Sequence, residues 1–184
     1  MHQTTVLLDN LYQKTEIFLE KAIREWQLLP AEQLNRQPAP NAWSAAQCLE
    51  HLNVYGRYYL PALKNALENA EKQPSKTYKS GWLGDYFYRL MLPNTEGSLK
   101  SKMKAPKNAV PPVELDSAAV IAEFIEQQEQ LLQLIDQARA VNLASTRIPI
   151  SLTKWIRLKL GDTFLFVVAH NERHILQAKR ALKT

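Results

Sequence analysis

Hydrophobic residues recur every three or four positions in four long stretches of the chain, the spacing of amphipathic helices that bury one face. Between the last two stretches, around Pro149, a weaker alternation of polar and apolar residues predicts a loop with short extended pieces. The four predicted helices span Thr4–Leu29, Ser44 to about Gln73, Ser117–Ala140 and Thr163–Leu182.

Several helix boundaries carry residues that can satisfy free backbone groups. Ser44 followed by Gln47 matches a capping box, in which each side chain pairs with the backbone N–H of the other residue. Asp116 is suited to cap the third helix, and Gly161-Asp162 to end one element and cap the fourth. Pro61 predicts a kink or a split in the second helix, because proline lacks the N–H of a helical hydrogen bond.

A long connection from Pro74 to Pro112 separates the second and third helices. Its middle, Gly81–Leu92, is rich in aromatic residues, and we expect a loop that lies across one end of the bundle. Four amphipathic helices with one long connection predict an all-α fold, an up-and-down variant of the four-helix bundle. The length of 184 residues suits a single domain spanning residues 1–184.

The net charge of +5 is concentrated in this connection. Eight basic and two acidic residues between Lys72 and Lys107 give the segment +6 and leave the rest of the chain at −1. The excess is a lysine-rich connection rather than a basic stripe along a helix, so nucleic acid is not the expected partner. A solvated loop is the simplest interpretation, with attraction of an anionic substrate or of nucleic acid as the alternatives.

The composition favours a cytoplasmic protein with no membrane association. The single cysteine, Cys48, excludes an internal disulfide and agrees with a reducing compartment. The longest apolar run, Phe164–Ala169, is too short to span a bilayer. The first residues, Met1–Thr4, lack the basic and apolar regions of a signal peptide.

Three of the four histidines carry the strongest chemical signal, while the fourth, His2, is expected in a mobile N-terminal tail. His170 and His174 are one helical turn apart on an apolar stripe, so both imidazoles can face a common point in the bundle. His51 lies at the edge of the inward stripe of the second helix, and an antiparallel helix pair can bring all three together. Three imidazoles with an open position form a catalytic zinc site, whereas hydrogen-bonded core histidines are the alternative.

The residues close to the three histidines in the sequence limit which kinds of metal enzyme are expected. Asn171 stands where the HExxH motif of zinc proteases has its glutamate, and Glu172 turns to the opposite face, which disfavours a protease of that type. Gln177, on the histidine face, is a candidate partner for a ligand or contact for a substrate, or else a glutamine bonded to a neighbouring helix. Tyr55, one turn after His51, is a candidate donor to a substrate, with a core tyrosine as the alternative.

Three segments of the chain carry family signatures. Trp43–Leu52 (WSAAQCLEHL) contains a tryptophan-serine pair and a histidine-leucine pair, and His170–Gln177 (HNERHILQ) contains two histidines and a glutamine. Between them, Lys104–Lys107 (KAPK) forms a basic proline tract. In order and spacing, these segments resemble the DinB/YfiT-like superfamily over nearly the full chain.

The resemblance implies a four-helix bundle with a divalent ion (zinc, nickel or similar) on three histidines, which correspond to His51, His170 and His174. Members of the superfamily include thiol transferases that use bacillithiol or mycothiol and metal-dependent hydrolases, and many have no known activity. The resemblance therefore implies a site that activates a water or a thiol for hydrolysis or thiol (S-)transfer on a small-molecule substrate. A low-molecular-weight thiol is a candidate cosubstrate, although no residue marks its site. A homodimer is compatible with the sequence.

Two functional classes remain open at this stage. The first is a metal-dependent enzyme, a hydrolase or a thiol transferase, whose catalytic residues beyond the ligands are not identified. The second is a non-catalytic helical module, in which the histidines are structural or bind metal for stability and the lysine-rich connection contacts a partner. A metal with an exchangeable water favours the enzyme, and a closed four-ligand site favours the module.

Overall fold

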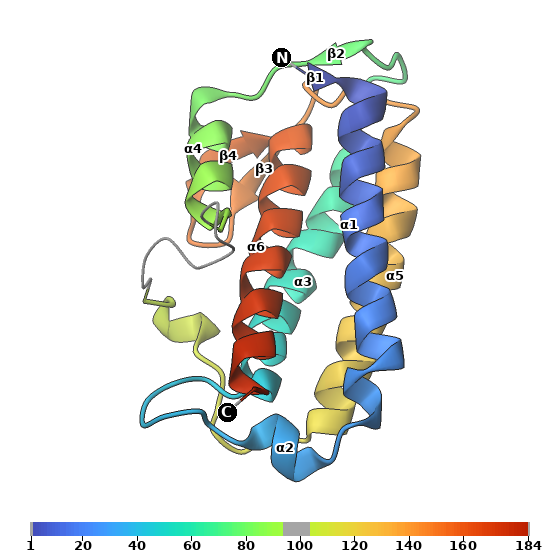
Figure 1. Ribbon diagram of the computed structural model, residues 1–184. Coiled ribbons are helices and arrows are strands. Elements are labelled where there is room, and N and C mark those ends of the chain that lie inside the picture. Colours follow the sequence, from blue (N-terminus) through green and yellow to red (C-terminus); the bar gives the residue numbers. More distant parts are fainter. Residues whose placement is uncertain (1, 94–103, 184) are drawn as a thin grey trace.

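The computed structural model describes residues 2–93 and 104–183 and is built around a bundle of four long helices (Figure 1). The helices are α1 (Thr4–Arg24), α2 (Ala31–Asn35), α3 (Ala45–Glu68), α4 (Trp82–Met91), α5 (Ser117–Ala138) and α6 (Leu160–Ala181). α1 and α6 run in one direction while α3 and α5 run in the other. The long connection therefore returns the chain to the end of the bundle at which α3 begins. α3 packs against α5 and α6, and α1 packs mainly against α5. The predicted all-α four-helix bundle is confirmed.

The predicted caps of α3 and α5 are present. Ser44 and Gln47 form the capping box, because the Ser44 hydroxyl accepts from Gln47 N across 3.2 Å and the Gln47 amide oxygen accepts from Ser44 N across 3.0 Å. The Asp116 carboxylate accepts from the backbone N–H groups of Ala118 and Ala119, both at 3.1 Å. These bonds satisfy N–H groups that have no partner within the helix. They therefore fix where α3 and α5 begin.

The buried faces of the long helices form the core, with Phe18 among the core residues of α1. Two predictions about the first two helices differ from the structure. α1 ends at Arg24, before a 3₁₀ turn at Trp26–Leu28, and not at Leu29. Pro61 does not split α3, because it lies on the exposed face, where water can replace the lost helical hydrogen bond. Among the described residues, none of the helices combines the length and the apolar character that crossing a membrane requires.

The aromatic middle of the long connection is helix α4, not the predicted loop, and α4 lies along the outer side of α6 (Figure 1). Asp162 of α6 accepts a hydrogen bond from Gly81 N across 3.0 Å. A Cβ on Gly84 would lie only 2.2 Å from the carboxyl carbon of Asp162, so glycine permits the close approach of the two helices. The prediction that Asp162 caps the last helix is wrong: α6 begins at Leu160, and Asp162 holds α4.

Within the described part of the chain, two antiparallel strand pairs flank the bundle. The short extended pieces predicted around Pro149 are a hairpin, and Tyr58 of α3 donates a hydrogen bond to Pro149 O across 3.2 Å. In the other pair His2 lies opposite Tyr78, so His2 belongs to a strand and the prediction of a mobile tail is wrong. The strands are β1 (His2–Gln3) with β2 (Thr77–Tyr78), and β3 (Arg147–Ile150) with β4 (Thr153–Lys159).

Candidate metal centre

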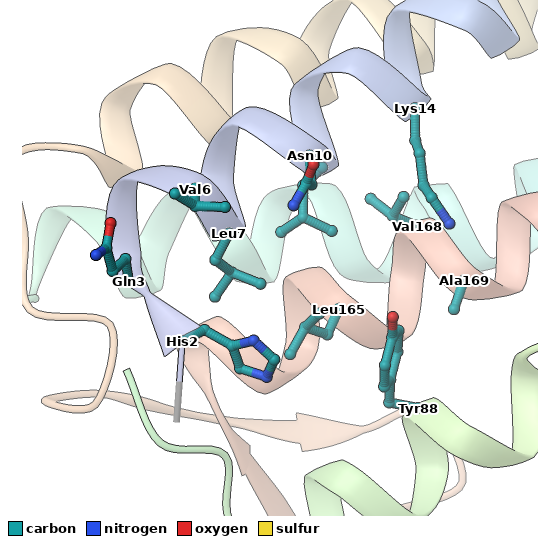
Figure 2. A pocket seen from close by; sticks show the side chains of 11 residues that line it. His2, Gln3, Val6, Leu7, Asn10, Lys14, Tyr88, Leu165, Val168 and Ala169 are labelled. Atoms are coloured by element: carbon teal, nitrogen blue, oxygen red, sulfur yellow. The ribbon is translucent and has the colours of Figure 1, made fainter. Parts of the chain in front are cut away.

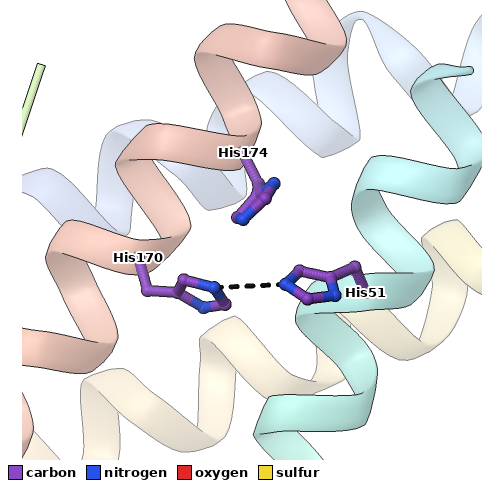
Figure 3. A group of neighbouring side chains, drawn as sticks. All are labelled: His51, His170 and His174. Carbon is purple, nitrogen blue, oxygen red and sulfur yellow. Dashed lines mark hydrogen bonds between the residues drawn. The ribbon is translucent and has the colours of Figure 1, made fainter. Parts of the chain in front are cut away.

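His51 of α3 and His170 and His174 of α6 point toward one another inside the bundle (Figure 3). One ring nitrogen of each lies within 4.8 Å of the corresponding nitrogens of the other two. The three residues are 3%, 4% and 9% exposed. The prediction that an antiparallel helix pair brings these histidines together is confirmed, because α3 and α6 run in opposite directions (Figure 1).

Two histidines have a defined ring orientation. His51 Nδ1 donates a hydrogen bond to the backbone oxygen of Ala109 across 2.7 Å, since a carbonyl can only accept. His174 Nδ1 lies 3.1 Å from Oε1 of Gln177 and donates to it. Each bond places the proton on Nδ1 and leaves a lone pair on Nε2, the atom that is free to bind a metal.

The contact to Ala109 comes from the long connection. Ala109 is the last residue of a short 3₁₀ turn, Lys107–Ala109, that follows the basic proline tract. Sequence reasoning missed it, because a backbone carbonyl carries no residue signature. Gln177, in contrast, was a candidate from its position on the histidine face, and of its alternatives the bond to His174 is the one found.

The spacing of one pair of ring nitrogens matches metal coordination, while all three lie within 4.8 Å of one another. His51 Nε2 and His170 Nε2 are 3.2 Å apart (Figure 3). Two nitrogens bound to one tetrahedral zinc ion at about 2.0–2.1 Å lie about 3.3–3.4 Å from each other. Without an ion, His170 Nε2–H donates to the lone pair of His51 Nε2, and an ion can take the place of that shared proton.

Burial keeps these imidazoles in the form that binds metal. The pKa values of His170 and His174 are well below the ordinary value, first because burial disfavours the charged ring. A second cause is that a charge on either ring would be repelled by Arg173 and by a charge on a neighbouring histidine. Burial also lowers the pKa of His51, and the hydrogen bond to Ala109 partly offsets it. All three rings are therefore neutral near pH 7, and neutral imidazole is the metal ligand.

Aromatic rings surround the three histidines. Trp43, just before α3, lies with its ring centre 4.9 Å from that of His51, and Phe166 stacks on His170 at 5.6 Å. The Tyr55 ring is 4.3 Å from that of His170, which places this half-buried residue beside the centre. Burial raises the pKa of Tyr55, so its hydroxyl stays protonated and can donate a hydrogen bond.

The remaining sequence candidates lie away from the centre or have other partners. Asn171 donates a hydrogen bond to Gln128 across 3.0 Å inside the bundle, and Glu172 pairs with Lys14 at 2.6 Å on the opposite face of α6, as predicted. Cys48 is buried, and burial raises its pKa, so it is inert as a nucleophile. In the lysine-rich connection, Lys104 and Lys107 are exposed, and Lys102 lies outside the described residues.

The geometry agrees with the comparison against known families. The family model of the DinB superfamily matches residues 16–178, a range that contains all three histidines. Neither the curated proteins nor the solved structures contain a significant match to the chain. Since the family model covers most of its length, the chain belongs to the DinB superfamily.

Proposed function

We propose that the protein is a divalent-metal-dependent enzyme whose ion, zinc, nickel or a similar metal, is held by His51, His170 and His174. One observation carries the proposal: the Nε2 atoms of His51 and His170 are 3.2 Å apart, close to the edge of a tetrahedral zinc site. Ala109 and Gln177 add to it, because they orient two of the rings with their lone pairs available. The group is three imidazoles, without a carboxylate or thiolate among them.

The donor set determines what such a site does. An ion on three neutral ligands keeps its full positive charge and, when bound, can acidify a water or a thiol and polarise a substrate. The three imidazoles leave a tetrahedral ion one open position, which is the arrangement of catalytic rather than structural sites. Hydrolysis or thiol transfer on a small-molecule substrate fits this arrangement.

In this proposal, the aromatic side chains around the histidines have different roles. Trp43 and Phe166 cover two of the histidines with apolar rings, which excludes water and strengthens electrostatic interactions inside the site. The Tyr55 ring stands beside that of His170, and its protonated hydroxyl interacts with the Ser151 side chain. In this proposal the hydroxyl donates to an oxygen or sulfur atom of the substrate instead. Tyr55 is therefore the candidate for orienting the substrate.

A non-catalytic module is the second candidate, and the burial of the cluster favours it. With the three histidines 3%, 4% and 9% exposed, the cluster is also compatible with a core in which the ion, or the hydrogen bonds alone, stabilises the bundle. The two functions differ in the fourth coordination position, which is open in an enzyme and closed in a structural site.

Cobalt substitution tests the proposal. Protein produced without a histidine tag, stripped of metal and reloaded with Co²⁺, is expected to bind one ion per chain and to show the visible spectrum of a four-coordinate site. Adding a small thiol or azide should change that spectrum, because an open position accepts an exogenous ligand. A spectrum that ignores both ligands would favour the structural module, and a protein that takes up no ion would rule out both metal-binding forms of the proposal.

A further inference from the structure

A cavity of about 470 Å³ lies between α1 and α6, with α4 at one side (Figure 2). It faces the side of α6 opposite to the metal centre: at 100° per residue, Val168 in its wall points about 160° away from His170. None of its lining residues belongs to the metal centre or contacts the three histidines through an aromatic ring. The cavity is thus a separate space in the same molecule.

Apolar side chains line much of the cavity, and Asn10 of α1 adds a polar group to this wall. Leu7 and Leu11 line it from α1, and Leu165 and Val168 line it from α6. Along α1 the lining extends from Val6 to Lys14, which corresponds to about 12 Å at a rise of about 1.5 Å per residue. This shape suits an elongated molecule with an apolar body, and the volume is in the range of small-molecule sites, about 300–1,000 Å³.

Polar groups lie at both ends of the cavity. Figure 2 shows Lys14 of α1 and the hydroxyl of Tyr88 of α4 directed into the cavity from different walls near Ala169, while His2 lies nearer the other end. The Lys14 ammonium pairs with Glu172 at 2.6 Å, and the two side chains are 41% and 24% exposed. An ammonium has three N–H donors, so one carboxylate leaves donors for a second acceptor.

We propose that this cavity is a second binding site, which takes an elongated, largely apolar carboxylate. The apolar body lies between Leu7, Leu165 and Val168, and the carboxylate accepts hydrogen bonds from Lys14 and Tyr88. The lysine selects an anionic head group over a neutral one, because a hydrogen bond between charged partners is stronger than one with a neutral partner. The site does not depend on the proposed metal-dependent activity.

Fluorescence of N-phenyl-1-naphthylamine, an uncharged apolar dye, tests the site in the full chain. The dye is expected to bind saturably at one site per chain, and decanoate should displace it on the order of tenfold more effectively than decanol, the size expected for a charge-assisted hydrogen bond. The double variant Lys14→Met with Glu172→Gln removes both charges of the ion pair, so that neither residue is left as an unpaired charge. In this variant the preference for decanoate should disappear while decanol still displaces the dye.

Two substitutions close the cavity in different ways. Ala169→Leu fills it from the buried wall, and Val6→Trp blocks it from a position that is 50% exposed, so the second variant keeps its core even if the first fails to fold. Both should abolish dye binding. Leu152→Ser removes an exposed apolar side chain from the β3–β4 turn and should leave dye binding unchanged.

Three results would overturn the proposal. Dye binding that survives both Ala169→Leu and Val6→Trp would place the dye elsewhere. Equal displacement by decanoate and decanol in the unaltered protein would remove the role of Lys14. Decanoate binding that is lost in His170→Ala but kept in Val6→Trp would assign the carboxylate to the metal centre, whereas binding that persists in His170→Ala supports the separate site.

Discussion

His51 and His170 are 119 positions apart in the sequence, yet their Nε2 atoms are 3.2 Å apart in the folded chain. The contact joins α3 and α6, which lie antiparallel within the bundle. An unfolded chain does not hold these nitrogens together, so binding of an ion at this centre is coupled to folding. The predictions on the centre follow from this coupling.

Loss of any one histidine should empty the centre. His51→Ala, His170→Ala and His174→Ala each leave two ligands, so metal content measured by mass spectrometry should fall from about one ion per chain to near zero. His2→Ala is the matched control, because His2 lies in β1 outside the cluster. An unchanged ion content in His51→Ala would remove α3 from the site.

Gln177 should act on the metal through His174. Gln177→Leu removes the acceptor of the His174 Nδ1 hydrogen bond, and metal affinity should fall by about 10–100-fold, the usual effect of losing such a partner. Gln177→Glu keeps an acceptor and should restore affinity. Competition with a chromogenic chelator measures both variants, and equal affinities for Leu and Glu would show that the hydrogen bond is irrelevant.

The metal-free protein should lose stability on acidification. In the folded state the pKa values of His170 and His174 are well below the ordinary value of about 6.5, while the unfolded chain regains that value. Below about pH 6.5 the unfolded state therefore binds more protons, and the free energy of unfolding falls as pH decreases, by up to about 1.4 kcal/mol per pH unit for each histidine. Above about pH 7.5 both histidines are neutral in the folded and the unfolded state, so they no longer change the free energy of unfolding with pH.

Urea unfolding between pH 5 and 8 measures this dependence. The double variant His170→Gln with His174→Gln serves as the control, since it lacks both titrating rings and should show a flatter pH profile. Stability that rises on acidification would contradict the direction of both pKa shifts.

Gly84→Ala should loosen α4 from α6. The added Cβ would meet the Asp162 carboxyl carbon at 2.2 Å, so the helices must separate, at a cost of about 1–3 kcal/mol in the free energy of unfolding. Amide hydrogen exchange should show faster exchange confined to α4 and its contacts. Tyr86→Ala, a change at an exposed position of the same helix, should alter stability by no more than about 0.5 kcal/mol.

Neutralising the exposed lysines of the basic proline tract should leave the fold unaffected. Lys104→Gln combined with Lys107→Gln changes two solvated side chains, so the free energy of unfolding should stay within about 0.5 kcal/mol of the unaltered protein. A larger loss in thermal or urea unfolding would show that these charges contribute to the packing of the connection.

The long helices and the histidine cluster could be predicted from the sequence because their signals are periodic and local. The Ser44–Gln47 capping box and the one-turn spacing of His170 and His174 each depend only on residues within one helix. His51 could be added because its helix also buries a continuous stripe. The hydrogen-bond partner of His51 could not be predicted, since Ala109 contributes a backbone oxygen, which any residue carries.

The predictions for α4, Asp162 and His2 were wrong because their structure depends on contacts between segments that are distant in the sequence. α4 is only ten residues long and is held by Asp162 from another helix, so its own pattern did not distinguish it from a loop. Asp162 has the residue type of a helix cap, but its carboxylate bonds the Gly81 N–H 81 positions away. His2 likewise has no local strand signal and pairs with Tyr78 across a two-residue ladder.

The hydrogen bond from His51 to Ala109 joins the buried centre to the surface of the molecule. The turn begins at the exposed Lys107 and ends at the buried Ala109, whose carbonyl fixes the His51 ring. The position of this turn therefore fixes the orientation of one candidate ligand, so the buried centre is not structurally independent of the surface connection.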